Sequence, residues 1–271
     1  MDVRKRSLAP IGDHAWGFLE ETARDVISAN LSARRVVDVA GPLGWDHAAV
    51  SLGRLSLPSN AKQIATPEAG AASEVGFGVR MVKPLVESRV AFTLSQWEMD
   101  NIARGALDAD VSALEEAAKR IAVFEERAVY EGLELGSIEG LDQVAEHRTK
   151  PSGDSLVGAI AAAVDTLRRA SVDGPYNVVL PTDQWQRLIE SCRGYPPEKQ
   201  IRSVTDGEVV ASPNVEKLYV VSARGGDLEL TLGQDFTLGF SRADGETVTL
   251  ELFESFSFRV LEPAAYVIVS A

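Results

Sequence analysis

The sequence has few of the side chains from which metal sites and disulfide frameworks are built. It contains one cysteine, Cys192, so no disulfide can form within the chain. Its three histidines, His14, His47 and His147, lie far apart and lack the spacing of metal ligands. We therefore expect no metal site, and the single cysteine suits a reducing compartment.

Long hydrophobic runs are also missing. The longest stretch of low polarity, residues 156–164, falls well short of the roughly 20 residues that a membrane-spanning helix needs. The basic start, Arg4-Lys5-Arg6, resembles that of a signal peptide, but Pro10 and Gly12 interrupt the apolar segment that should follow. We expect a soluble, cytoplasmic protein with no membrane partner.

Positive charge is scarce as well. Lys and Arg number 27 against 40 Asp and Glu, which gives a formal net charge of −13. A surface this acidic repels phosphate backbones, so we expect no nucleic-acid partner. The 271 residues are nevertheless 45% hydrophobic, which is enough for a sizeable core and excludes a mostly disordered chain.

The common catalytic motifs do not occur. The chain has no Walker A loop, no Gly-x-Ser-x-Gly and no His-Glu-x-x-His, and Gly76-Phe77-Gly78 lacks the third glycine of a dinucleotide site. Two adjacent acidic pairs, Glu115-Glu116 and Glu125-Glu126, fall on a predicted helix, where neighbours point about 100° apart. We interpret both pairs as solvated helix face, predict no catalytic residue and do not expect an enzyme.

What is present is an α+β pattern with helices early and strands late. Apolar residues recur at three- and four-residue steps over residues 13–33 and 112–135, the second helix opening with a Ser112-x-x-Glu115 capping box. This second helix would be over 30 Å long, a spine of the fold. A third helix is predicted over residues 154–170.

Strands are expected over residues 34–39, 82–94 and 178–180, with a helix opening at Thr182. Two prolines predict that residues 191–199 are a non-helical loop. From residue 218 onward apolar residues alternate with polar ones, which predicts one antiparallel sheet with a solvated face. Residues 56–78, rich in proline, glycine and alanine, predict a long extended loop that reaches a neighbouring subunit.

An ordered set of short blocks resembles the encapsulin family along essentially the whole chain. Each block alone is weak, but their order is specific. The blocks are Lys5–Pro10, Val36–Val39 with Gly41–Trp45, Phe92–Leu94, Trp97–Asn101 with Arg104-Gly105, Asp173–Tyr176, Gly194–Pro196, Arg224–Asp227, Leu232–Asp235 and Glu254–Phe258.

The resemblance implies the Hong-Kong-97-type fold of tailed-phage major capsid proteins. It also implies an icosahedral shell of about sixty or more identical subunits. Its parts would be an N-terminal arm and helix (1–40), an extended loop (48–80), a peripheral domain with the spine helix (81–137 and 216–271) and an axial domain (138–215). The enclosed cargo would be a ferritin-like iron-storage protein or a dye-decolourising peroxidase.

The family also implies two sites. A groove between the first helix and the final sheet would hold a C-terminal cargo peptide, lined by Leu31, Arg34, Asp38, Leu238 and Phe240. Alternatively, Leu238 and Phe240 are plain sheet core and Arg34 pairs locally with Asp38. Small molecules or ions would enter through pores. The five-fold pore would be lined by Ser191, Cys192, Arg193, Gly194 and Tyr195.

Some encapsulins bind flavin, and Arg89 with Trp97 could hold a planar aromatic ligand by stacking and cation–π contact. We favour the alternative that Trp97 packs into the core, with no cofactor. Two other readings of the whole chain stay open, a prophage major capsid protein and a bacteriocin- or protease-like enzyme.

Overall fold

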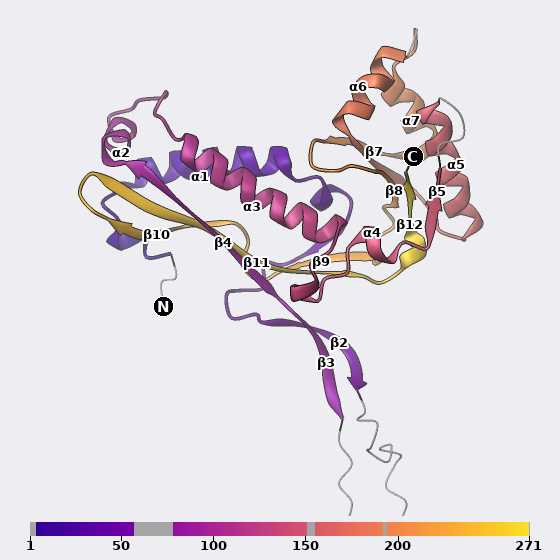
Figure 1. Cartoon of the computed structure of the whole chain (residues 1–271), viewed down its shortest axis with the longest axis horizontal. Helices are drawn as coiled ribbons and strands as arrows, with labels where there is room; N and C mark the ends of the chain where they lie inside the picture. Colours follow the sequence, from indigo (N-terminus) through magenta and orange to yellow (C-terminus); the bar gives the residue numbers. More distant parts are fainter. Residues whose placement is uncertain (1–3, 57–77, 151–154, 192–193, 271) are drawn as a thin grey trace, which may run out of the picture.

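The computed structural model describes residues 4–56, 78–150, 155–191 and 194–270. Figure 1 shows two lobes and a projecting hairpin: an elongated lobe that carries α1 and α3, and a second lobe built around α5, α6 and α7. The helices are α1 (Asp13–Asn30), α2 (Gln96–Ala103), α3 (Ser112–Tyr130), α4 (Leu141–Val144), α5 (Leu156–Arg169), α6 (Thr182–Ser191) and α7 (Pro197–Thr205), with short 3₁₀ turns η1 (Arg6–Leu8), η2 (Ala33–Arg35), η3 (Glu134–Gly136) and η4 (Pro263–Ala265).

The elongated lobe is a five-stranded sheet covered by α1 and α3. Its strands run in the order β1-β9-β11-β10, and β4 pairs with the other edge of the long strand β11. The strands are β1 (Asp38–Ala40), β4 (Val86–Ser95), β9 (Leu228–Leu232), β10 (Thr237–Ala243) and β11 (Thr247–Val260). The apolar stripes of both helices meet the sheet in one core, in which Leu19, Leu114 and Leu250 have no exposed surface.

The second lobe holds the other five-stranded sheet, in the order β5-β12-β8-β6-β7. The strands are β5 (His147–Thr149), β6 (Tyr176–Pro181), β7 (Asp206–Ser212), β8 (Leu218–Ser222) and β12 (Tyr266–Val269). The helices α5, α6 and α7 contribute to a core on one face of this sheet. On its other face, Tyr219 meets Tyr130 of α3 with ring centroids 4.8 Å apart, so the spine helix joins the two lobes.

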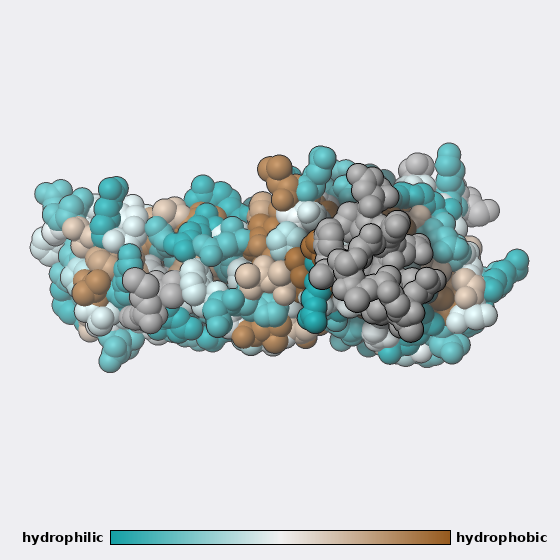
Figure 2. All heavy atoms as spheres, turned by 90° about the horizontal axis from the view of Figure 1, so that it is seen from below, coloured by the Kyte–Doolittle hydropathy of each residue, from teal (hydrophilic) through white to brown (hydrophobic). Residues whose placement is uncertain are grey.

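The third part is the hairpin of β2 (Ala49–Ser56) and β3 (Val79–Pro84), which projects away from both lobes (Figure 1). Residues 57–77 of the predicted extended loop lie outside the described residues. Four apolar side chains near the end of the described hairpin, Leu55, Val79, Met81 and Val82, are 41–61% exposed. Figure 2 shows brown, apolar side chains beside the grey residues on a face that is otherwise largely polar.

The helices predicted over residues 13–33, 112–135 and 154–170 are present as α1, α3 and α5, but each is shorter than predicted. The predicted strand over 34–39 is wrong in its first half, because the chain makes the η2 turn before β1. The predicted capping box is also wrong: the Ser112 hydroxyl donates to Asp110 rather than capping α3. Pro197 starts α7 instead of keeping the segment non-helical, since proline is tolerated in the first turn of a helix.

The prediction of a single C-terminal sheet is wrong as well. The alternating strands divide between the two sheets, with β8 and β12 in the second lobe. Along β11, residues 252–258 are buried on both faces, so the solvated face is missing there. The domain boundary predicted at residue 216 divides this second sheet. Its strands β5, β6 and β7 come before residue 216 in the chain, whereas β8 and β12 come after it.

Candidate functional site

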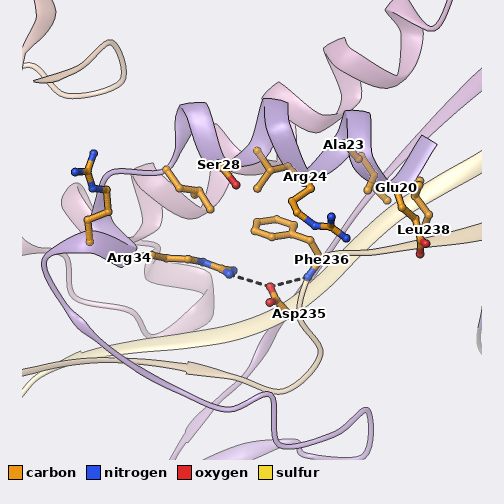
Figure 3. Close-up of a pocket in the computed structure, with 12 residues that line it drawn as sticks. Glu20, Ala23, Arg24, Ser28, Arg34, Asp235, Phe236 and Leu238 are labelled. Atoms are coloured by element: carbon orange, nitrogen blue, oxygen red, sulfur yellow. Dashed lines mark hydrogen bonds and ion pairs between the residues drawn. The ribbon is translucent and has the colours of Figure 1, made fainter. Parts of the chain in front are cut away.

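A pocket of about 420 Å³ opens between α1 and the start of β10. Five residues of α1 and Leu31, which directly follows the helix, are spaced three or four apart and form one wall, as expected for a single helical face. Figure 3 shows these side chains on one side and the segment Asp235–Leu238 facing them. The lining residues are Glu20, Ala23, Arg24, Ile27, Ser28, Leu31, Arg34, Arg35, Asp235, Phe236, Leu238 and Leu252.

Arg34 is a largely buried arginine that lines this pocket. Its Nε and Nη2 atoms donate to Glu125 over 2.6–3.1 Å, and Nη1 donates to Asp235 Oδ1 over 2.9 Å. Its guanidinium also lies 4.6 Å from the centre of the Phe236 ring. Burial alone would lower the pKa of Arg34, but the hydrogen bonds and charge of Glu125 raise it above its ordinary value. This arginine is therefore a permanently charged part of the framework.

A third carboxylate, Glu254 of β11, lies 3.6 Å from Arg34 Nη2 and accepts a hydrogen bond from the Ser88 hydroxyl. Glu125 and Glu254 have no exposed surface. Burial, together with the charge of Glu125, holds the pKa of Glu254 well above its usual range.

Glu125 and Glu126 are not solvated, and our prediction for this pair is wrong. Glu126 accepts hydrogen bonds from the backbone N–H groups of Ser32 and Ala33 over 2.9 and 2.7 Å, and from the Ser32 hydroxyl over 2.5 Å. These donors lie at the start of η2, so Glu126 holds the turn that follows α1. The two acids thus point to two different partners, as neighbours on a helix must.

Glu126 makes the stability of the subunit depend on pH. Burial raises its pKa from 4.5 to about 7, despite its three donors. Between these values the folded chain keeps a proton that the unfolded chain has lost, so stability falls as pH rises from about 4.5 to 7. The expected loss is about 3 kcal/mol. The melting temperature of the native protein should therefore fall as the pH rises from about 4.5 to 7. In Glu126→Gln this fall should be smaller by several degrees.

The matched control is Glu116→Gln, an exposed acid on the same helix, which should keep the pH profile of the native protein. The pKa of Glu254 is raised as well, but this residue is the same in all three proteins, so differences between them isolate Glu126. Identical slopes in Glu126→Gln and Glu116→Gln would contradict the assignment.

The five residues predicted for the cargo groove do not all meet. Leu31, Arg34 and Leu238 line the pocket, although Leu238 is only 2% exposed and belongs to the sheet core, as the alternative describes. Asp38 lies elsewhere, where its Oδ2 accepts a hydrogen bond from the Gly226 N–H, and it forms no pair with Arg34. Phe240 packs against the core and donates its N–H to the Arg4 carbonyl over 2.8 Å, as the alternative of plain sheet core describes.

The predicted pore residues fall at the end of α6 and before α7. Cys192 and Arg193 lie outside the described residues, and Ser191 is the last residue of α6. Gly194 has a φ of 98°, in the region that favours glycine, and Tyr195 is 55% exposed. The pore therefore remains a prediction.

Arg89 and Trp97 do not form the predicted pair. The Arg89 guanidinium lies 5.5 Å from the Trp45 ring and 5.6 Å from the Phe253 ring. Trp97 is 72% exposed on α2, so our preferred interpretation of a packed tryptophan is also wrong. Within the described ranges, no group of three His, Cys, Asp or Glu side chains could hold a metal ion. No helix of these ranges is long and apolar enough to cross a membrane.

Several pocket residues escaped the sequence analysis. Arg24, Ser28, Asp235 and Phe236 line the pocket, together with Glu20, Ala23, Ile27, Arg35 and Leu252. The helical period of residues 13–33 could have identified the α1 wall, because Glu20, Ala23, Arg24, Ile27, Ser28 and Leu31 share one face. No local signal marks Asp235 and Phe236, which reach the pocket through the sheet topology.

Comparisons with known proteins show which family this chain resembles over nearly its whole length. Residues 1–257 match the family model Linocin_M18, "Encapsulating protein for peroxidase". The chain is 42% identical to a type 1 encapsulin shell protein of Rhodospirillum rubrum, covering 98% of this chain and 96% of the relative. It is 36% identical to the type 1 encapsulin shell protein of Mycobacterium tuberculosis, covering 98% of each.

Solved structures share the fold. The virus-like particle of Pyrococcus furiosus aligns with a TM-score of 0.66 at 18% identity, covering 94% of this chain and 99% of that one. The capsid of Myoviridae phage XM1 aligns with a TM-score of 0.54 at 11% identity, covering 86% and 88%. These alignments confirm the predicted tailed-phage capsid fold.

Proposed function

Because the chain belongs to the type 1 encapsulin shell proteins of the Linocin_M18 family, we propose that the pocket beside α1 binds a C-terminal peptide of an enclosed cargo protein. The chain is a structural protein rather than an enzyme: copies of it form a nanocompartment around their cargo. The proposal concerns how one subunit recognises that cargo.

The observation that carries the proposal is a pocket along α1 whose lining combines apolar side chains with charged ones. From Glu20 to Leu31 the α1 wall is about 16 Å long, at about 1.5 Å per residue. An extended peptide rises about 3.3 Å per residue, so about five residues fit. Ala23, Ile27, Phe236 and Leu238 give the pocket an apolar lining, although Ala23, Ile27 and Leu238 are at most 6% exposed. Fixed charges at Arg34 and Asp235 would set its register.

The family description supports a peroxidase as cargo. A ferritin-like iron-storage protein stays a prediction of the sequence resemblance, and no contact in the described residues distinguishes the two. The encapsulin shell proteins of Rhodospirillum rubrum and Mycobacterium tuberculosis are 42% and 36% identical, whereas the phage XM1 capsid is 11% identical and shares the fold alone. These identities favour a cargo compartment over a prophage capsid.

The exposed apolar side chains of the β2–β3 hairpin support assembly through this element. Leu55, Val79, Met81 and Val82 project where a neighbouring subunit can bury them. Sixty copies of the 29.1 kDa chain, the minimum for an icosahedral shell, would weigh about 1.7 MDa. Light scattering and negative-stain imaging of the purified chain should show hollow spheres of at least this mass. A stable monomer or dimer would contradict the shell.

The peptide site is tested by electron cryo-microscopy of shells co-expressed with a reporter protein that carries the C-terminal peptide of a peroxidase cargo. Density along α1, between Ala23 and Phe236, should appear in loaded shells and be absent from shells expressed alone. Reporter density in the shell interior without density in the groove would place the recognition site elsewhere.

A further inference from the structure

The charged side chains around the groove are paired, with one exception. Arg6 bonds to Glu20, Arg34 bonds to Asp235 over 2.9 Å, and Arg35 bonds to Glu208 over 3.0 Å. Within residues 4–56, 78–150, 155–191 and 194–270, the Arg24 guanidinium has neither an ion pair nor a hydrogen bond. It is exposed on the groove wall and, as Figure 3 shows, extends from α1 toward Phe236.

Arg24 is unpaired because its natural partner is engaged elsewhere. Glu20 precedes it by four residues, the spacing and order at which an acid and a base pair on a helix surface. In the structure Glu20 instead contacts Arg6 of the N-terminal arm, whose guanidinium lies 4.8 Å from the centre of the Trp16 ring. The arm therefore withdraws the acid from Arg24 and leaves a cation beside the apolar wall.

We propose that Arg24 makes the groove selective for cargo peptides that carry a carboxylate beside their aliphatic residues. This inference rests on the proposed function and adds the charge of the ligand to it. Aliphatic side chains would contact Ala23 and Ile27 while an aspartate or glutamate, or the terminal carboxylate, pairs with Arg24. Because the site is open to water, such a pair contributes a modest selectivity of about fivefold rather than the bulk of the affinity.

The chain as a whole argues for the opposite preference. With a formal charge of −13, its general electrostatic field favours basic peptides over acidic ones. A preference for acidic peptides would therefore have to arise from a local cation. Whether shells prefer acidic or basic peptides therefore distinguishes the local effect of Arg24 from the general charge of the chain.

The test is a competition for loading inside one cell. Two fluorescent reporter proteins are co-expressed with the full-length chain. Both reporters end in a tail of leucines alternating with serines. One serine of this tail is replaced by glutamate in the first reporter and by lysine in the second, and the experiment is repeated for each serine position. The ratio of the two colours in purified shells reports selectivity independently of shell yield. We expect a glutamate preference of about fivefold in native shells and its reversal in Arg24→Glu.

A second variant tests the role of the arm. In Arg6→Ala, Glu20 is free to pair with Arg24, so the glutamate preference should decline although Arg24 is still present. Arg120→Gln, which removes an exposed arginine of α3 that does not line the groove, is the matched control and should keep the native ratio.

The outcomes separate the two proposals. If native shells load neither reporter, the peptide groove itself fails. If they load both reporters at a ratio that Arg24→Glu leaves unchanged, the groove stands and the role of Arg24 is refuted. If native shells prefer lysine tails, the general charge of the chain decides selectivity and the inference is wrong.

Discussion

Shells of the Ser28→Trp variant are expected to assemble normally and to contain at least tenfold less cargo than native shells. Ser28 is exposed in the middle of the α1 wall, facing Phe236 across the groove (Figure 3). An indole there would cover on the order of 200 Å² of apolar surface and occupy much of a pocket of about 420 Å³. Serine and tryptophan have similar helix propensities, so α1 itself should be unaffected.

The control is the neighbouring position. Ala29 is also exposed on α1 but does not line the groove, so Ala29→Trp should load cargo like the native protein. Ser28→Leu fills less of the groove and should give an intermediate load. Cargo per shell is measured as reporter fluorescence divided by shell protein, with particle size checked by light scattering. Native loading in Ser28→Trp would remove this groove as the recognition site.

The largest effect on stability is expected from Arg34→Ala. This substitution removes three hydrogen bonds of 2.6–3.1 Å to Glu125, which has no exposed surface, as well as the contact with Phe236. A buried carboxylate left without its partner typically costs about 3–5 kcal/mol. For a chain of this size the melting temperature should fall by roughly 10 °C.

Arg35→Ala is the matched comparison, because Arg35 and its partner Glu208 are 52% and 56% exposed. That pair should contribute less than about 1 kcal/mol. The deficit of Arg34→Ala should shrink in the double variant with Glu125→Gln, because the amide leaves no unpaired charge in the buried site. Equal small losses in Arg34→Ala and Arg35→Ala would show that the buried network is not what holds this turn.

These expectations also change how a loss of cargo in an Arg34 variant should be interpreted. A basic residue in a peptide groove invites substitution as a test of binding, and the sequence resemblance placed it there with Asp38. In the structure, Arg34 is held by its ion pair with the buried Glu125, and Asp38 lies outside the groove. Loss of cargo in Arg34→Ala would therefore mix lost recognition with a loosened turn, and Ser28→Trp is the cleaner experiment.

The sequence allowed the fold to be predicted because its strongest signals are local. The stripes of α1 and α3 and the alternation after residue 218 are periodic, and the ordered family blocks identify the capsid architecture. The fate of Glu125-Glu126 could not be predicted in this way. Their partners, Arg34 and the backbone of Ser32 and Ala33, lie more than 90 residues away, and only the packing of α1 against α3 brings them together.

The same limit explains the errors at Trp97 and around Arg34. Composition favours burial of a tryptophan, yet α2 leaves Trp97 on the surface. Residues 34–39 have the composition of a strand, but the carboxylate of Glu126 stabilises a 3₁₀ turn over their first half. In both places a contact distant in sequence overrides the local preference.

The long strand β11 has a consequence for how the protein is made. It pairs with β4 across residues about 160 positions apart and also carries β9 and β10. Until residue 260 has left the ribosome, α1 and α3 have no complete sheet to cover, a wait of roughly ten to fifty seconds at ordinary rates of translation. During biosynthesis, the nascent chain thus exposes two amphipathic helices to chaperones and to other nascent chains. With the proposed groove between α1 and β10, cargo would be captured only by finished subunits, so that filling would follow translation.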